Sequence, residues 1–204
     1  MSFGAPATRL CVARHGETDW NIEEILQGWL DIAINDNGRQ QAREFAAACA
    51  ETGFVRIYSS PLRRALETAE IIADELHLAS PLCHEGLKER NFGVVQGMPK
   101  VVLAKMNPLL LEEIRRRNPA CEFEYGESMD HFASRVLNAI IDIGERHAGE
   151  RILAITHGWV MDVIARHIGN LDRSAILDRK TKNGEFLWLE VGERSIVRLA
   201  VESG

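Results

Sequence analysis

The pattern of apolar and polar positions changes its period along the chain and predicts strands and helices in turn. Three short apolar runs are typical of buried strands: RLCVA at 9–13, VRIYS at 55–59 and RILAIT at 151–156. Four segments carry apolar positions at helical spacing: 37–53, 61–77, 129–147 and 159–169. The final runs, EFLWLEV and SIVRLAV, are joined by the turn sequence GER and predict a closing hairpin.

This alternation predicts an α/β fold, a three-layer sandwich in which helices flank a mostly parallel central sheet. The segment from about 87 to 126 breaks the alternation. Its first part is irregular, and the stretch that follows indicates two short helices broken at Pro108. We interpret about 87–126 as a lid-like helical insertion over the sheet edge, within a single domain that spans residues 1–204.

Composition and charge narrow the class of partner. Apolar residues make up 46% of the chain and the formal net charge is −6, which disfavours nucleic acid and anionic membranes as partners. The N-terminus has no apolar signal segment and no run is long enough to span a bilayer, so we expect a cytoplasmic protein. The four cysteines form no C-x-x-C pair, so we expect buried free thiols and no metal site: Cys11, Cys49, Cys83 and Cys121.

Two of the predicted strands end in a His-Gly pair. The first strand is followed by Arg14, His15 and Gly16, and the strand at 151–156 by His157 and Gly158. Ligands of open α/β sheets bind beyond the carboxyl ends of the strands. If the two strands are neighbours, the two histidines face each other across one mouth. Each glycine is expected to let the backbone approach a ligand closely.

The neighbours of the first histidine indicate phosphoryl transfer. The cation of Arg14 disfavours protonation of His15 and keeps it neutral and able to act as a nucleophile. A guanidinium is also a planar fork of donors that matches phosphate. Arg63 and Arg64, in the first turn of a predicted helix, offer more of these donors. Glu89 in the irregular middle segment supplies the acid that an alkoxide leaving group requires.

These motifs resemble those of the histidine phosphatase superfamily, also called the phosphoglycerate mutase-like superfamily. The matching pieces follow the family's order: RHGETDWN, LQGWLD, SSPLRRALETA, LKERNFGVVQG, YGES with a later RV, and ITHG. The resemblance implies a metal-independent phosphatase for small phosphate monoesters that needs no cofactor. Two alternatives stay open: phosphoglycerate mutase-type phosphoryl transfer on the same site, and a catalytically silent phosphate-binding module. In the family that the chain resembles, true mutases carry a longer insertion between the acid and the second His-Gly, so the short segment between Glu89 and His157 favours the phosphatase.

The resemblance also implies a role for each matching residue. His15 is the phosphorylated nucleophile and Glu89 the proton donor. The other members of the phosphate pocket are Arg14, Arg64, His157, Asn21 and, through its backbone N–H, Gly158. Gln27 and Gly28 line the substrate side. Trp159 stands where the family often has a second glycine, so its indole either narrows the pocket or stacks on the substrate.

Other residues of similar chemistry are assigned elsewhere. Arg63 is expected to be solvated and paired with Glu67, four positions on. The run IRRR at 114–117 is interpreted as a solvated helix end; the alternative is that it reaches a second phosphate of the substrate. Six aliphatic residues are expected to form one apolar face beside the pocket: Val101, Val102, Leu103, Leu109, Leu110 and Leu111. The expected partner is a small phosphorylated metabolite; the oligomeric state stays open, a homodimer included.

Overall fold

The computed structural model describes residues 6–171, 175, 181–192 and 195–199. In this part of the chain a six-stranded sheet has the order β3-β2-β4-β1-β5-β6. Its strands are β1 (Thr8–Arg14), β2 (Arg56–Ser59), β3 (Leu82–Cys83), β4 (Arg151–Thr156), β5 (Phe186–Gly192) and β6 (Ser195–Arg198). The first four run parallel, and β5 and β6 form the antiparallel hairpin that the sequence predicted. The turn residues 193–194 and the last two residues of the predicted second strand lie outside the described residues.

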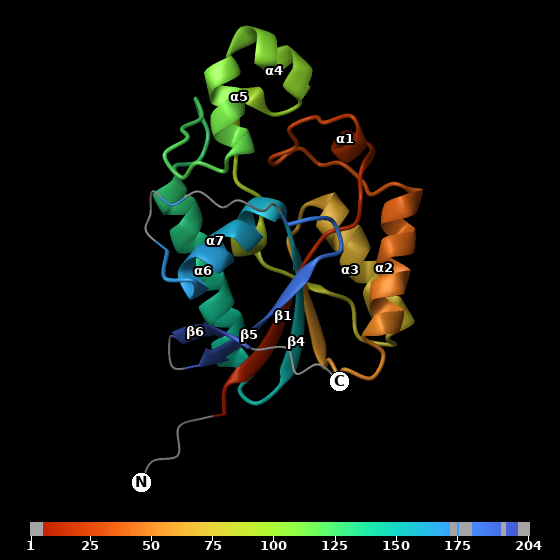
Figure 1. The fold of residues 1–204 in the computed structure, drawn as a ribbon. Helices are drawn as coiled ribbons and strands as arrows, with labels where there is room; N and C mark the ends of the chain where they lie inside the picture. Colours follow the sequence, from red (N-terminus) through yellow and green to blue (C-terminus); the bar gives the residue numbers. More distant parts are fainter. Residues whose placement is uncertain (1–5, 172–174, 176–180, 193–194, 200–204) are drawn as a thin grey trace.

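Helices cover both faces of the sheet (Figure 1). They are α2 (Asp36–Ala48) and α3 (Arg63–Glu75) on one face, and α6 (Met129–Arg146) and α7 (Gly158–Ile168) on the other. Successive side chains of a strand point to opposite faces. In β1, Leu10 and Val12 therefore join the core beneath α6 and α7, whereas Cys11 and Ala13 join the core beneath α2 and α3. Burial on both faces explains the continuous apolar runs and confirms the three-layer architecture.

The predicted start of α3 is two residues too early. The helical pattern begins at residue 61, but the helix begins at Arg63 with Leu62 as its N-cap in an extended conformation. Leu62 offers no side-chain oxygen for capping. The backbone N–H of Arg63 instead donates to Asp31 Oδ1 at 2.7 Å, so a loop distant in sequence supplies the cap.

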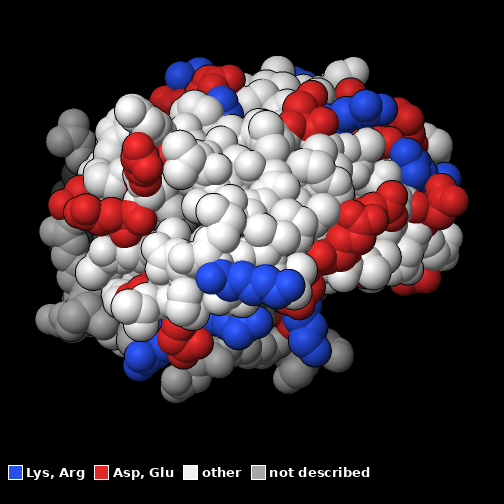
Figure 2. Space-filling view, turned by 90° about the horizontal axis from the view of Figure 1, so that it is seen from above, with Lys and Arg blue, Asp and Glu red and all other residues white. Residues whose placement is uncertain are grey.

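The inserted segment lies beyond the carboxyl ends of the parallel strands rather than along an edge of the sheet (Figure 1). Its helices are α4 (Lys100–Met106) and α5 (Pro108–Arg115), and the predicted break at Pro108 is confirmed. The short helix α1 (Asp19–Ile22) lies on the same side. Uncharged residues occupy the centre of the surface seen from above, with acidic and basic residues around it (Figure 2). We call residues 99–117 the lid.

The prediction of one apolar lid face is wrong. Leu103 and Leu111 are each 2% exposed and belong to the core, whereas Val101 and Leu109 are 65% and 79% exposed. Each helix is short and rests on the core along one side only, so its other aliphatic side chains point to solvent.

Two expectations from composition have different outcomes. Three of the cysteines are buried, but Cys83 is exposed because it lies on the two-residue edge strand β3. Across the described ranges, none of the helices combines the length and the apolar character that crossing a bilayer would require.

Candidate active site

The sheet register brings the two histidines together. In the parallel pairing of β1 with β4, Arg14 lies opposite Thr156, and each strand ends one residue before a histidine. The backbone N–H of His15 donates to the carbonyl of Thr156 at 2.9 Å. The imidazole centroids of His15 and His157 are 5.2 Å apart. The predicted juxtaposition is confirmed.

His15 has the protonation state of a nucleophile. Its Nδ1 lies 2.6 Å from the carbonyl oxygen of Gly16, which can only accept, so Nδ1 carries the proton and Nε2 keeps its lone pair. Burial lowers the pKa of His15 well below its ordinary value, and the cations of Arg64 and Arg14 lower it further. The imidazole is therefore neutral at physiological pH, with Nε2 unprotonated.

Arg14 and Arg64 supply buried positive charge beside this imidazole. Arg64 donates to the carbonyls of Gly28 and Leu30 at 2.8 and 3.0 Å, and Arg14 donates to that of Thr181 at 2.6 Å. Burial lowers the pKa of each arginine to about 10, which still leaves both charged at neutral pH. These bonds hold both guanidinium groups in place before any ligand arrives.

Several buried nitrogen atoms around the site have no hydrogen-bond partner among the described residues. They are Arg14 Nε, Arg64 Nε, Arg117 Nη1 and His157 Nδ1. Buried polar groups in folded proteins nearly always have a partner. A cluster of unpaired nitrogens, most of them guanidinium donors, is therefore the signature of a site for an oxyanion.

A pocket of about 270 Å³ opens over these groups. Of the predicted residues, those that line it are Arg14, His15, Asn21, Gln27, Gly28, Arg64, Glu89 and Trp159. His157 and Gly158 do not line it. His157 is fully buried against His15, and its Nε2 lies 2.7 Å from Ser60 Oγ.

Asn21 and Gln27 are held by the start of α1. Thr18 caps that helix, and its hydroxyl oxygen accepts from the backbone of Asn21 at 3.1 Å and from Gln27 Nε2 at 2.8 Å. Asn21 Oδ1 accepts from the backbone of Thr18 and from Asn183 Nδ2, each at 3.2 Å. Because its oxygen is engaged in this way, the amide nitrogen is the group of Asn21 that can serve an anion.

Asn183 is a pocket residue that the sequence reasoning missed. Its side-chain amide donates to the carbonyls of His15 and Gly16 at 2.9 and 3.2 Å, and it lines the pocket. It thereby fixes the backbone that carries the nucleophile. It lies between α7 and the hairpin, in a stretch without a motif, so nothing in the sequence could have identified it.

Glu89 is positioned through its backbone. Its carbonyl accepts from Trp29 Nε1 at 2.6 Å and from Arg135 Nη2 at 2.8 Å. Its carboxylate accepts from the backbone N–H of Arg90 at 2.9 Å and lies 3.5 Å from that of Trp159. These contacts hold the carboxyl group in the pocket wall, and the residue as a whole is 8% exposed.

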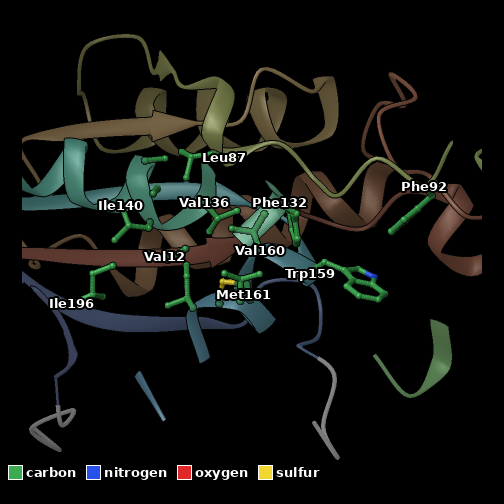
Figure 3. Packing of buried hydrophobic residues seen from close by; sticks show 14 of the residues in the cluster. Val12, Leu87, Phe92, Phe132, Val136, Ile140, Trp159, Val160, Met161 and Ile196 are labelled. Atoms are coloured by element: carbon green, nitrogen blue, oxygen red, sulfur yellow. The ribbon is translucent and has the colours of Figure 1, made fainter. Parts of the chain in front are cut away.

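Trp159 forms part of the same wall and is 4% exposed. Its indole meets the ring of Phe92 edge-on at 5.8 Å, and Figure 3 shows it extending from α7 toward that residue. The guanidinium of Arg117 lies 4.7 Å from the indole centroid. The indole thus narrows the pocket; its contact with a substrate stays a prediction.

The two His-Gly glycines serve different purposes. A Cβ on Gly158 would lie 3.0 Å from Arg117 Nη2, next to the anion site. A Cβ on Gly16 would lie 2.5 Å from the carbonyl oxygen of Gly38 at the start of α2. The expectation of a close ligand is therefore wrong for Gly16, whose small size allows two backbone segments to pack together.

The predicted pairing of Arg63 with Glu67 is also wrong. Glu67 instead forms an ion pair with Arg39 of α2 at 2.7 Å and accepts from the backbone of Ile34 at 3.2 Å. Helix α2 packs directly on α3, so its arginine reaches the carboxylate.

The run at 114–117 is only partly a solvated helix end. Arg115 and Arg116 are exposed, as expected. Arg117, however, leaves α5 with a φ of 54°, which turns its side chain into the protein, where it pairs with Asp162 at 3.2 Å. The prediction is wrong for this residue. Three successive arginines at a helix end contain no signal that tells which of them turns inward.

The two buried histidines predict a pH dependence of stability. Burial lowers the pKa of His15 and of His157 well below the ordinary value of 6.5. The unfolded chain therefore binds protons below pH 6.5 that the folded protein does not, so stability falls as the pH falls. Each histidine should contribute about 1.4 kcal/mol per pH unit between about pH 6 and 5. Urea unfolding at several pH values measures the slope. His157→Asn should make it shallower by that amount, and equal slopes would contradict this assignment.

Comparisons with known proteins give a consistent result. Residues 10–202 match the model of the histidine phosphatase superfamily (branch 1). Phosphoglycerate mutase-like protein 4 of Arabidopsis thaliana is 39% identical over 154 residues, 74% of this chain and 67% of that protein. The metal-independent phosphoserine phosphatase of the same plant is 34% identical over 159 residues, 77% of this chain and 67% of that protein. The structure of Bacillus stearothermophilus YhfR superposes with a TM-score of 0.87 at 28% identity and covers 96% of both chains.

Proposed function

The chain belongs to the histidine phosphatase superfamily, and we propose that it is a metal-independent phosphatase that hydrolyses small phosphate monoesters through a phosphohistidine at His15. One observation carries the proposal. A neutral histidine, with Nε2 unprotonated, lies beside Arg14 and Arg64, each of which has a buried nitrogen without a partner among the described residues. A nucleophile and an anion site thus coincide.

In the first step, the lone pair on His15 Nε2 attacks phosphorus and the bond from phosphorus to the ester oxygen breaks. The departing oxygen takes the proton of the Glu89 carboxyl group, so the alcohol leaves neutral. Arg14 and Arg64 stabilise the negative charge on the transferred group. The imidazole becomes cationic, and the carbonyl of Gly16, which accepts from Nδ1, favours that charge.

In the second step, water attacks the phosphorus of the phosphohistidine. The carboxylate of Glu89 takes a proton from the water as the new bond forms. The electron pair of the breaking N–P bond returns to Nε2, and inorganic phosphate leaves. Both His15 and Glu89 then have the protonation states in which they began.

The mutase alternative uses the same first step and differs in the acceptor. A mutase returns the phosphoryl group to the substrate instead of transferring it to water. The similarity to a protein named as phosphoglycerate mutase-like supports keeping this alternative. Release of inorganic phosphate from a panel of esters, measured beside phosphoglycerate isomerisation, distinguishes the two. A silent module would form no phosphohistidine at all.

We expect the activity to survive removal of metal ions. Arg14 and Arg64 already supply the positive charge that a metal supplies in other phosphatases. After exhaustive chelation, the rate of nitrophenyl phosphate hydrolysis should stay within about twofold of the untreated rate, since no step requires a Lewis acid. An activity that disappears with chelator and returns with magnesium or zinc would contradict the proposed mechanism.

A further inference from the structure

The cations around the pocket fall into two groups. Arg14 and Arg64, beside the nucleophile, form no ion pair with a carboxylate within 4.0 Å among the described residues. Two cations of the lid line the pocket, Lys100 and Arg117, and both are paired with carboxylates of the protein itself. The two cations beside the phosphate site are thus not offset by a carboxylate at contact distance, whereas both lid cations are.

The pair between Arg117 and Asp162 is buried. The two side chains are 10% and 2% exposed, and Arg117 Nε lies 3.2 Å from Asp162 Oδ2. Burial raises the pKa of Asp162, and the guanidinium opposes that rise and favours the carboxylate. Arg166 also donates to the carbonyl of Arg117 at 2.9 Å and fixes its backbone. Asp162 therefore offsets the charge of Arg117 inside the pocket wall, while Arg117 Nη1, which has no hydrogen-bond partner among the described residues, stays available to donate to a neutral oxygen of a ligand.

The pair between Lys100 and Glu24 lies at the edge of the pocket. Lys100 Nζ is 2.7 Å from Glu24 Oε1, and the side chains are 24% and 62% exposed. An exposed pair of this kind is weak on its own. Here the backbone N–H of Lys100 also donates to the carbonyl of Glu24 at 3.0 Å. This second contact holds the two residues side by side, so the ammonium faces a carboxylate of the protein.

Six of the other residues that line the pocket are apolar or aromatic: Trp20, Ile25, Leu26, Phe92, Ile114 and Trp159. Resting on the proposed function, which places the phosphate at His15, we infer that the alcohol half of the substrate is neutral and carries no second anionic group. An anionic alcohol half would lose its water against apolar side chains and cations that are already paired, which is unfavourable.

Two esters test this inference directly. Glycerol 3-phosphate and 3-phosphoglycerate differ only at carbon 1, which is a hydroxymethyl group in the first and a carboxylate in the second. For the native chain, kcat/KM for the neutral ester should be at least about tenfold higher. In Asp162→Asn, Arg117 keeps its charge but loses its carboxylate. The ratio should then move about tenfold toward phosphoglycerate. Glu112→Gln on the exposed surface of α5 removes the same charge away from the pocket and should leave the ratio unchanged.

Binding to His15→Ala, which cannot form the intermediate, separates this inference from the proposed function. Dissociation constants for both esters, with and without Asp162→Asn, should show the same preference and the same shift. Equal or tighter binding of phosphoglycerate, an unchanged ratio in Asp162→Asn, or no binding of either ester to folded protein overturns the inference. Preferred binding of the neutral ester without any phosphohistidine in the native chain overturns the proposed function alone. If Asp162→Asn does not fold, Glu24→Gln at the exposed pair should shift the ratio in the same direction.

Discussion

His15→Ala should lower the rate of phosphate ester hydrolysis on the order of 10⁶-fold, the size of loss seen when an enzyme loses its attacking nucleophile. In the proposed mechanism both chemical steps pass through Nε2 of this residue, and His157 cannot replace it. The ring of His157 is fully buried and its Nε2 contacts Ser60 Oγ. Steady-state release of inorganic phosphate measures the loss. His167→Ala, at an exposed position late in α7, is the matched control and should retain native rates.

The covalent intermediate gives this prediction a second measurement. Brief incubation with phosphate-labelled ester, followed by a quench without acid, should trap label on the native chain. The label should be stable to base and lost in acid, as a phosphoramidate bond is. His15→Ala should trap none. Label that appears equally on the variant would place the nucleophile elsewhere.

Glu89→Gln should slow the hydrolysis of alkyl phosphates by roughly 10²- to 10⁴-fold, the usual contribution of a general acid. Glutamine keeps the size of the side chain but has no proton to give to an alkoxide. Nitrophenolate leaves without such help, so formation of the phosphohistidine from nitrophenyl phosphate should slow far less. The first step is the one to compare, by rapid mixing, because the proposed mechanism also has Glu89 act on water in the second.

A matched variant shows whether position alone explains the effect. Glu85→Gln makes the same change at a side chain that is 79% exposed in the preceding turn, and it should not alter either rate. If Glu89→Gln slows the first step equally for alkyl and nitrophenyl esters, Glu89 only orients the phosphate. The acid must then be another residue of the middle segment.

The chemical centre could be predicted because its members follow short, local signals. A strand that ends in His-Gly specifies where His15 and His157 lie once the two strands pair; the sequence left that pairing as a condition, and the structure fulfils it. The place of Arg64 could be predicted because a strand leads directly into the helix whose first turn carries this residue. Glu89 could be proposed from the need for an acid and from the family motif, but its position could not, since its backbone is held by Trp29 and Arg135, which are distant in sequence.

The remainder of the pocket could not be predicted because it depends on tertiary contacts. Arg117 lines the pocket because its own positive φ turns its side chain toward Asp162. This aspartate lies in α7, 45 positions further along the chain. Asn183 lies in a stretch without periodicity, yet it holds the carbonyl of His15. The lid face was predicted wrongly for the same reason. Helical spacing identifies the apolar residues of a short helix but not the side that rests on the core.

The phosphate site and the lid are built from different kinds of contact, and this difference decides which positions can change without loss of the site. His15 and His157 depend on the pairing of β1 with β4, where a slip by a single residue would send one imidazole to the opposite face of the sheet. An insertion or deletion in either strand should therefore separate the two imidazoles. The lid meets the sheet only beyond the strand ends, and its pairs with Asp162 and Glu24 are contacts between side chains that substitution can rewrite. Substrate range can thus change by mutation of the lid while the catalytic centre stays the same, which makes residues 99–117 the natural region to randomise in a directed-evolution library.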